Sequence, residues 1–304
     1  MTSAIHEKKS LNLAWWNIGV SPPILKPTKI KNDELFNAIQ FIKKTAVEKS
    51  MDLWALCEGA KRDAPSLKSV SDDLDLVFID ISGPDGRVVV DLAFLYESSK
   101  LCFINSKNIN VKMPDQSTLR IGVKAIFRDV INNEFITFFF SHWPSQLHLS
   151  EQDKIRFATS LRLNIDSVFE RYGDDSKIIL MGDYNSQPYS YSIHESLYAT
   201  KDHYLVIKKP RLLFNPFWKL ISDGHKNNLG TYFYKSSKID RWFVFDQMMF
   251  SSVFLVPNAK SNTLKLDLSS FSCHSIFDRD GVIVDNLFHK SFDHSPIYGR
   301  LYYE

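Results

Sequence analysis

The sequence predicts an α/β fold, a four-layer sandwich in which two packed, mainly antiparallel sheets are flanked by helices. A strand, a helix and a second strand follow one another twice along the 304 residues, and runs of strands lie between these two units. No low-complexity linker or change of composition divides the chain. We therefore expect a single domain over residues 1–304, with two similar halves at about 11–145 and 150–304.

The first strand–helix–strand unit lies near the start of the chain. Residues 11–18 alternate apolar and polar side chains and predict a strand. Asn32 or Asp33 is expected to cap a helix, because apolar residues then recur at helical spacing. Residues 52–57 predict a short buried strand that ends at Glu58.

Several strand-like runs separated by short turn signals follow this unit, and they predict an antiparallel meander. These runs are 76–81, 88–96, 101–111, 119–130 and 134–142.

The second unit begins at Ser150, which forms an approximate capping box with Asp153 ahead of an apolar helical stripe. Residues 177–181 then predict a buried strand that ends at Gly182. The stretch 186–230 is rich in prolines and loops. Strands are expected again at 230–234, 241–250, 281–284 and 296–302.

The formal charge is only +2, which argues against a protein that binds nucleic acid over its whole surface. The charge is segregated, however. Residues 201–270 hold eleven Lys or Arg and five Asp, a local balance of +6 that leaves the rest of the chain near −4. Aromatic residues interleave with these cations, so the window predicts either a nucleic-acid groove or a solvated face over core aromatics.

Composition also bounds the location of the protein. The first ten residues carry no apolar run behind a basic start, and no stretch approaches the length of a spanning helix, so we expect no signal peptide and no membrane partner. Three well-separated cysteines, Cys57, Cys102 and Cys273, lack metal-site spacing and predict reduced thiols. A cytoplasmic protein is expected, and its protein partners stay open.

Polar residues repeatedly stand where apolar strands end or begin. Acids, amides and two histidines without a cysteine cluster favour a hard cation, Mg²⁺ or Mn²⁺, over Zn²⁺. Such a site can polarise a phosphoryl oxygen and predicts phosphoester hydrolysis. The residues are Asn17, Glu58, His142, Asp183, Asn185, Asp293 and His294.

Six short blocks in this order resemble the endonuclease/exonuclease/phosphatase superfamily, typified by deoxyribonuclease I. Together they span positions 16 to 297, nearly the whole chain. The resemblance implies a deoxyribonuclease I-like fold and metal-dependent hydrolysis of phosphoric esters. The blocks are Trp16-Asn17, Cys57-Glu58, Ser141-His142-Trp143-Pro144-Ser145, Gly182-Asp183-Tyr184-Asn185, the six residues from Asp246 to Ser251 and the seven from Ser291 to Ile297.

The resemblance implies a role for each matching residue. Glu58, assisted by Asn17 and Asp293, would hold the metal, and Asp183 would orient or deprotonate the attacking water. The scissile phosphate would be contacted by Asn185 and His142, and Arg241 and Trp143 are further candidates for substrate binding. His294, held by Asp246, would stabilise the developing charge or protonate the leaving group.

Two assignments stay open at this point. Asp240 stands in a second block like that of Asp246, and we keep it in reserve as the partner of His294. Asp91 is the only acid inside residues 88–96, which makes it a weaker candidate for the partner of His142.

We expect a nuclease acting on DNA or RNA. The alternative is a phosphatase or phosphodiesterase for a small phosphoester or a phospholipid headgroup, as in sphingomyelinases and inositol phosphatases. A catalytically silent binding module is the third possibility, although the acids and histidines of the blocks are all present. No G-x-S-x-G occurs, which argues against a serine hydrolase.

Overall fold

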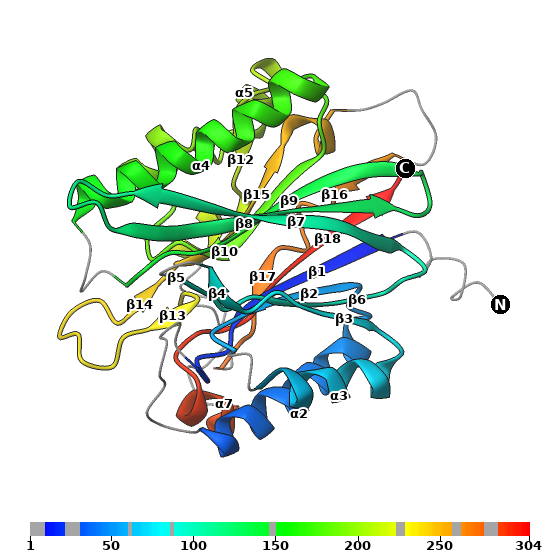
Figure 1. Ribbon diagram of the computed structural model, residues 1–304, viewed down its shortest axis with the longest axis vertical. Helices are drawn as coiled ribbons and strands as arrows, with labels where there is room; N and C mark the ends of the chain where they lie inside the picture. The colour runs from blue at the N-terminus through cyan, green and yellow to red at the C-terminus, as the bar shows by residue number, and fades with distance from the viewer. Residues whose placement is uncertain are drawn as a thin grey trace.

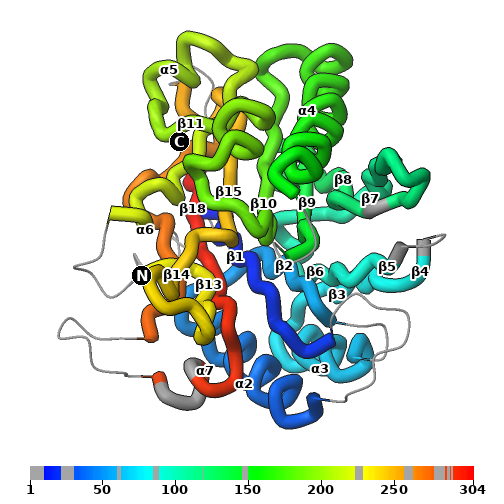
Figure 2. Tube along the Cα trace, turned by 90° about the vertical axis from the view of Figure 1, so that its left-hand side faces the viewer, coloured from blue at the N-terminus to red at the C-terminus, as the bar shows by residue number. Residues whose placement is uncertain are grey.

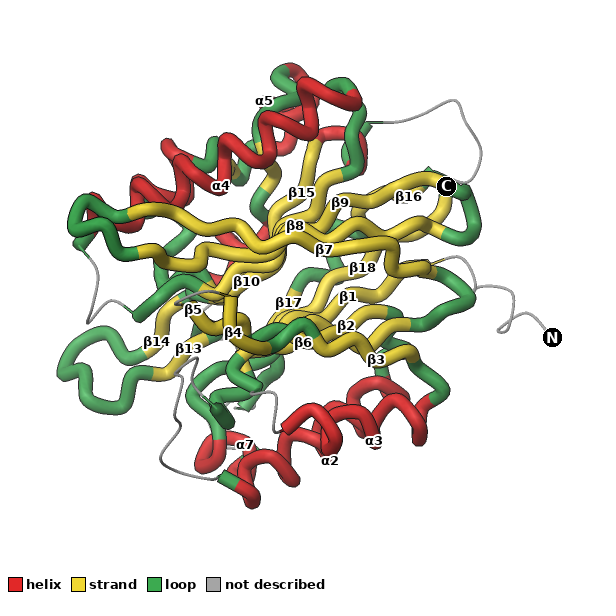
Figure 3. The backbone as a smooth tube through the Cα atoms, viewed as in Figure 1, coloured by secondary structure: helices red, strands yellow, loops and turns green. Residues whose placement is uncertain are grey.

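The computed structural model describes residues 10–21, 31–59, 63–85, 88–145, 150–222, 229–256, 263–276 and 285–304. Two seven-stranded sheets pack face to face, and helices cover both outer faces (Figures 1 and 3). The predicted four-layer α/β sandwich is confirmed. No helix in the described parts of the chain is long and apolar enough to cross a membrane.

The first sheet joins the two ends of the chain, because its first and last strands are neighbours (Figure 2). The central pair, β1 and β2, is parallel and its other pairs are antiparallel. Its order is β16 (Leu264–Leu266), β18 (Ile297–Tyr303), β1 (Ser10–Asn17), β2 (Leu53–Cys57), β6 (Ala93–Tyr96) and β3 (Val77–Asp80), and β17 (Ser272–Cys273) also pairs with β18.

The second sheet repeats this plan around the parallel pair β9 and β10. The strands β7, β8 and β9 form an antiparallel meander. The first two runs of the predicted meander, 76–81 and 88–96, do not join it, because β3 and β6 pair in the first sheet. The order of the sheet is β11 (Ala199–Thr200), β12 (Leu213–Phe214), β15 (Asp246–Ser251), β10 (Ile178–Asp183), β9 (Glu134–His142), β8 (Thr118–Asp129) and β7 (Leu101–Lys112).

A long helix links the parallel pair in each half, α2 (Asn32–Glu48) between β1 and β2 and α4 (Glu151–Tyr172) between β9 and β10. Short elements complete the chain. They are α3 (Ala64–Leu74), α5 (His203–Lys208), α6 (Lys219–Ser222), α7 (Asn286–Ser291), η2 (Ser192–Ser196), η3 (Pro216–Trp218), η4 (Ser252–Phe254) and the strand pairs β4 (Gly83–Asp85) with β5 (Val88–Val90) and β13 (Tyr232–Phe233) with β14 (Trp242–Phe243).

Three apolar clusters separate the four layers. Phe94 and Phe138 belong to the cluster between the two sheets. Leu161 of α4 packs in the cluster over the second sheet, and Ile42 of α2 packs with Trp54 over the first. Each of these side chains is fully buried, and burying one large apolar side chain is worth about 1.5–3 kcal/mol.

The helix starts behave differently in the two units. The capping box of α4 is confirmed, since Ser150 Oγ accepts from the Asp153 N–H at 3.2 Å and Asp153 Oδ2 accepts from the Ser150 N–H at 3.1 Å. The cap expected at Asn32 or Asp33 is absent. Lys31 occupies the N-cap position of α2 and makes no side-chain capping bond.

The structure differs from the prediction in three places: one helix is additional, and two predicted strands are each divided. Helix α3 was not expected, because only Leu67, Val70 and Ser71 of its polar sequence are buried. The run 88–96 divides into β5 and β6, and the run 241–250 divides into β14 and β15. The predicted strand 281–284 lies outside the described residues.

Candidate active site

The polar strand ends converge on one edge of the sandwich. In the first sheet Asn17 ends β1 and Glu58 directly follows β2, while His294 precedes β18. In the second sheet His142 and Asp183 end β9 and β10. Carboxyl ends of parallel strands share an edge, and the antiparallel neighbours begin there, so the topology gathers these side chains.

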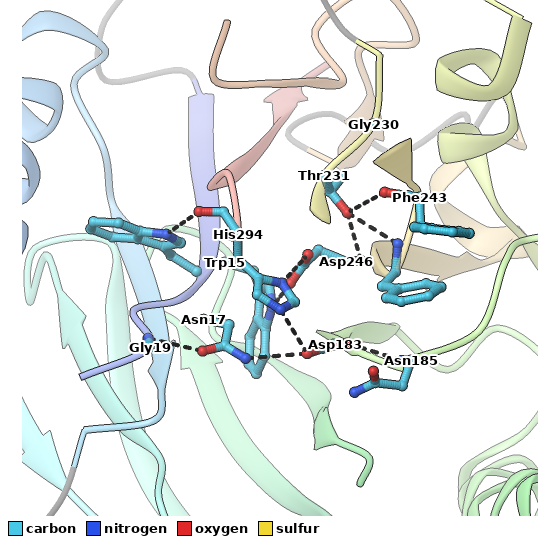
Figure 4. A network of polar contacts seen from close by, with 12 residues as sticks. Trp15, Asn17, Gly19, Asp183, Asn185, Gly230, Thr231, Phe243, Asp246 and His294 are labelled. Carbon is cyan, nitrogen blue, oxygen red and sulfur yellow. Dashed lines mark hydrogen bonds and ion pairs between the residues drawn. The ribbon is translucent and has the colours of Figure 1, made fainter. Parts of the chain in front are cut away.

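Asn17 connects the acids of the two sheets. Its Nδ2 donates to Glu58 Oε1 at 3.1 Å and to Asp183 Oδ2 at 3.2 Å, and its Oδ1 accepts from the Gly19 N–H at 3.0 Å (Figure 4). Because the Gly19 N–H is an obligatory donor, it fixes which way the amide points. The nitrogen of Asn17 therefore faces the carboxylates, and its part in holding a metal stays a prediction.

His294 lies between two carboxylates (Figure 4). Its Nδ1 is 2.8 Å from Asp246 Oδ2, and its Nε2 is 3.6 Å from Asp183 Oδ2. Burial alone disfavours the imidazolium, but these carboxylates outweigh burial and raise the pKa of His294 to about 10. Burial raises the pKa of Asp183 to about 6 despite the nearby imidazolium. At neutral pH the pair is an imidazolium beside a carboxylate.

Two contacts hold Asp246 in addition to its bond with His294. The indole Nε1 of Trp15 donates to its Oδ1 at 3.0 Å, and Thr231 Oγ1 accepts from the Asp246 N–H at 2.9 Å (Figure 4). Asp240, the reserve candidate, is exposed in the chain between β13 and β14. The partner of His294 in the structure is therefore Asp246 and not Asp240.

A second histidine–aspartate pair lies beside the first. His142 Nδ1 is 2.7 Å from Asp91 Oδ2, and His142 Nε2 is 3.4 Å from Glu58 Oε1. The carboxylates of Asp91 and Glu58 overcome burial and raise the pKa of His142 well above its usual value. Arg120 forms an ion pair with Asp91 Oδ1, so Arg120 and His142 hold the pKa of Asp91 well below its usual range in spite of burial. Asp91 thus contacts His142 as the weaker prediction suggested.

Two site residues have left-handed backbones, with φ of +57° at Glu58 and +46° at Asn185. Such conformations are uncommon for residues with a Cβ and persist where neighbours hold them. The Glu58 N–H donates to Asp91 Oδ2 at 3.2 Å, and Asn185 Nδ2 donates to the carbonyl of Trp143 at 2.8 Å. These contacts therefore hold the backbone of Glu58 and the side chain of Asn185.

Glu58 and Asp293 are the acids of this edge that open to solvent. Glu58 keeps 22% of its side chain exposed, and Asp293 is exposed next to Gly19. Burial alone raises the pKa of Glu58, but bonds from His142 and Asn17 outweigh burial and lower it, which keeps the group ionised. Open, ionised oxygen donors fit a hard divalent cation.

Two other clusters bring three possible ligand atoms within 4.8 Å of one another, Cys57 with Asp91 and His142, and Asp183 with Asp246 and His294. In each cluster the histidine nitrogen is already bonded to an aspartate. We therefore interpret them as hydrogen-bonded acid–base groups and not as open metal sites.

Trp143 and Arg241, the further candidates for substrate binding, differ in their exposure to solvent. Trp143 is fully buried, and its Nε1 donates to the Ile121 carbonyl at 3.1 Å in the cluster beneath α4. Its side chain cannot reach a substrate, which corrects that prediction; successive strand side chains point to opposite faces, and Trp143 follows His142. Arg241 is exposed, with its guanidinium 4.6 Å from the ring centroid of Phe233.

Four residues of the site were not predicted: Trp15, Arg120, Thr231 and Tyr232. The Tyr232 ring centroid is 4.6 Å from that of His294. Burial and the carboxylates of Asp293 and Asp183 raise the pKa of Tyr232 to about 12, so its phenol stays neutral. None of the four is marked in the sequence, since the strand of Arg120 also carries the charged residues Lys124, Arg128 and Asp129.

The basic, aromatic window 201–270 is not one surface. Phe217 is buried in the core between the sheets, and Arg211 pairs with Asp174 at 2.8 Å. Tyr232 borders the site, whereas Tyr204 is exposed at α5. Part of the window is therefore a solvated face over core aromatics, and a nucleic-acid groove stays a prediction.

Carboxylates and two histidine–aspartate pairs meet at this edge, where they offer oxygen donors and proton-transfer groups. The chain belongs to the Endonuclease/Exonuclease/phosphatase family, because the model of that family matches residues 64–291. It is thus a phosphoric ester hydrolase by family, as predicted. A comparison with curated proteins gives no match.

Solved structures of the same fold are similar over almost the entire chain. The human Nocturnin catalytic domain with bound sulfate anion has a TM-score of 0.62 at 13% identity, and the alignment covers 97% of this chain and 95% of the Nocturnin chain. TDP2 of D. rerio with a single-strand DNA product scores 0.58 at 15% identity, with coverages of 96% and 98%. A mannosyl-6-phosphatase of Bacteroides thetaiotaomicron scores 0.60 at 14% identity, with coverages of 96% and 99%.

Proposed function

We propose that this protein is a nuclease that hydrolyses phosphodiester bonds of DNA or RNA with the help of Mg²⁺ or Mn²⁺. The observation that carries the proposal is the position of His294. Its ring bonds to Asp246 at 2.8 Å and points its other nitrogen at Asp183, 3.6 Å away. An oriented imidazolium beside an ionised carboxylate is suited to moving a proton across a phosphoester.

The proposed ligands of the metal are Glu58 and Asp293, whose oxygens are the open acids of the site. A bound divalent cation supplies Lewis-acid polarisation of the phosphoryl oxygen. Asn17 holds the carboxylates of Glu58 and Asp183 close together through the two hydrogen bonds of its amide nitrogen. These acids belong to different sheets, so packing of the sandwich sets their separation.

Asp183 is the proposed base. Its pKa of about 6 leaves it ionised at neutral pH and able to accept a proton from an attacking water. His294, with a pKa of about 10, is charged at the same pH and can stabilise or protonate the departing oxygen. Asp246 and Trp15 maintain the ring and carboxylate in this orientation.

His142 and Asn185 are the proposed phosphate contacts. His142 is a buried imidazolium between Asp91 and Glu58, so it brings positive charge to an edge rich in acids. This charge offsets the repulsion that an incoming phosphate would meet from the carboxylates. Arg120 supports His142 through Asp91 and does not need to touch the substrate.

A nucleic-acid substrate is favoured by the aromatic hairpin that borders His294. Tyr232 and Tyr234 stack with ring centroids 6.4 Å apart, and Tyr234 is 40% exposed. Lys235, Lys238 and Arg241 are exposed in the same hairpin. Flat rings for bases and cations for phosphates are the elements of single-strand binding surfaces.

A cytoplasmic location is proposed because all three cysteines are free thiols.

A substrate panel at several salt concentrations tests the proposal. We expect cleavage of single-stranded DNA or RNA with Mg²⁺ or Mn²⁺, none with a chelator, and a steep fall as salt rises, since phosphate contacts release counterions. Small phosphoesters such as sugar phosphates should react weakly and without that salt dependence. Turnover confined to the small substrates would contradict a nuclease while leaving the hydrolase class intact.

A further inference from the structure

A hollow of about 510 Å³ lies in the second half of the chain and is lined by aromatic rings. Tyr189, Phe214 and Trp218 contribute to its walls, and Lys201 lies at its rim. The Lys201 Nζ is 5.1 Å from the ring centroid of Trp218. The volume is within the usual range for ligand pockets, roughly 300–1,000 Å³.

The topology places this hollow at the same edge as the site. Strand β15 is antiparallel to both β10 and β12, so β12 runs in the direction of β10, and β11 is parallel to β12. Asp183 ends β10, while Lys201 and Trp218 follow β11 and β12. Phe214 at the end of β12 pairs with Phe250 and is therefore level with Ile179, four residues before Asp183. Two strand spacings across and four residues along put the end of β12 roughly 16 Å from Asp183.

A chain of buried hydrogen bonds joins the hollow to the site. Asn215, in its lining, donates from Nδ2 to Gln247 Oε1 at 2.8 Å. Gln247 Nε2 in turn donates to the carbonyl of Ser186 at 2.7 Å. Gln247 is the neighbour of Asp246, and Ser186 is the neighbour of Asn185. The two places are therefore held in a fixed relation.

Two aromatic residues of the hollow, Trp218 and Tyr189, differ in exposure. The Trp218 Nε1 is buried yet has no hydrogen-bond partner in the part of the chain that the structure describes. Tyr189 is 58% exposed, with its ring centroid 6.5 Å from that of Trp218. The Trp218 N–H has almost no accessible surface and does not face a ligand, so the exposed ring of Tyr189 is the group of this pair that can stack on one.

We propose that this hollow is a subsite for a nucleotide of a single-stranded nucleic acid, several nucleotides away from the scissile phosphate; this rests on the proposed nuclease function. An unpaired base stacks on Tyr189, and Lys201 pairs with its phosphate. The substrate strand then runs from the hairpin of Tyr232, past His294, to this hollow.

The test compares Lys201→Glu and Tyr189→Ala with two matched controls. Lys208→Glu changes an exposed lysine of α5, and Tyr172→Ala removes a 56% exposed tyrosine of α4. The first measurement is the ratio of kcat/KM for a short single-stranded oligonucleotide to that for a dinucleotide. The second is binding of a labelled oligonucleotide, by fluorescence anisotropy, in an Asp183→Asn background that does not cleave it.

We expect each test variant to lower the kcat/KM ratio and the affinity by roughly five-fold or more, through KM, with the controls unchanged. An unchanged ratio and affinity in both test variants would overturn the subsite. Equal losses in Lys201→Glu and Lys208→Glu would also overturn it, because they would indicate general charge attraction. If the wild type cleaves no nucleic acid but Lys201→Glu and Tyr189→Ala still weaken binding, the proposed function fails and the subsite stands.

Discussion

Trp15 and Asp246 belong to facing sheets, and the indole Nε1 of Trp15 donates to Asp246 Oδ1 at 3.0 Å. Asp91 has the same arrangement in the other half of the site. One of its oxygens holds His142 and the other holds Arg120. Each histidine of the site is therefore oriented by an aspartate of the opposite sheet, and the packing of the sandwich aligns both pairs.

Replacing Trp15 by Phe tests the cost of losing this bond. Trp15→Phe keeps a buried ring but removes the donor to Asp246, so we expect a stability loss of about 1.5–3 kcal/mol and a kcat about ten-fold lower. Denaturant unfolding and initial rates measure the two effects. Trp54→Phe is the matched control, since its indole N–H has no partner among the described residues; a loss of kcat as large in the control would contradict the orienting role.

Thr231 fixes the backbone at Asp246. Its Oγ1 accepts from the N–H of Phe245 at 3.0 Å and of Asp246 at 2.9 Å. Thr231→Val keeps the shape but leaves both donors buried without an acceptor, which should cost about 1–3 kcal/mol and lower kcat. Thr231→Ser retains the hydroxyl and should recover most of the rate. Equal rates in the two variants would show that the hydroxyl does not position Asp246.

Arg120 compensates a buried carboxylate. Its side chain and that of Asp91 are 5% and 1% exposed, so Arg120→Met should destabilise the fold by about 3–5 kcal/mol. Arg128→Met on the same strand is exposed and should be nearly neutral. Adding Asp91→Asn to Arg120→Met removes the unpaired charge, so part of the stability should return in a double-mutant cycle followed by thermal unfolding. Strict additivity of the two changes would contradict the pair.

The rate should depend on pH through Asp183. A base whose pKa is raised to about 6 is protonated below that value, so kcat should fall about ten-fold per pH unit as pH drops below 6 and level off above it. The residual rate of Asp183→Asn should lack this limb. A flat profile of the wild type between pH 5 and about 7 would rule Asp183 out as the base.

The sequence allowed the sandwich and most site positions to be predicted because both depend on local patterns. Strand ends carry Asn17, His142 and Asp183, and each lies where its strand predicts. The capping box at Ser150 is also a local signal. The division of 88–96 at Asp91 was missed, since an apolar run does not reveal where a strand begins to pair.

The remaining contacts depend on how the two sheets face each other. Trp15 and Asp246 are 231 positions apart, and no local pattern relates them. The misassignment of Trp143 has a different, local cause. Its neighbour His142 faces the site, but alternation along the strand turns the indole into the core beneath α4.

Hydrolysis of a labelled oligonucleotide by the wild type and by Asp183→Asn tests the central claim most directly. With Mg²⁺ or Mn²⁺ the wild type should cleave the strand, and a chelator should stop it. Asp183→Asn should unfold as cooperatively as the wild type and cleave at least about 100-fold more slowly. A folded wild type that cleaves no nucleic acid with either metal, or an Asp183→Asn variant as active as the wild type, would contradict the account.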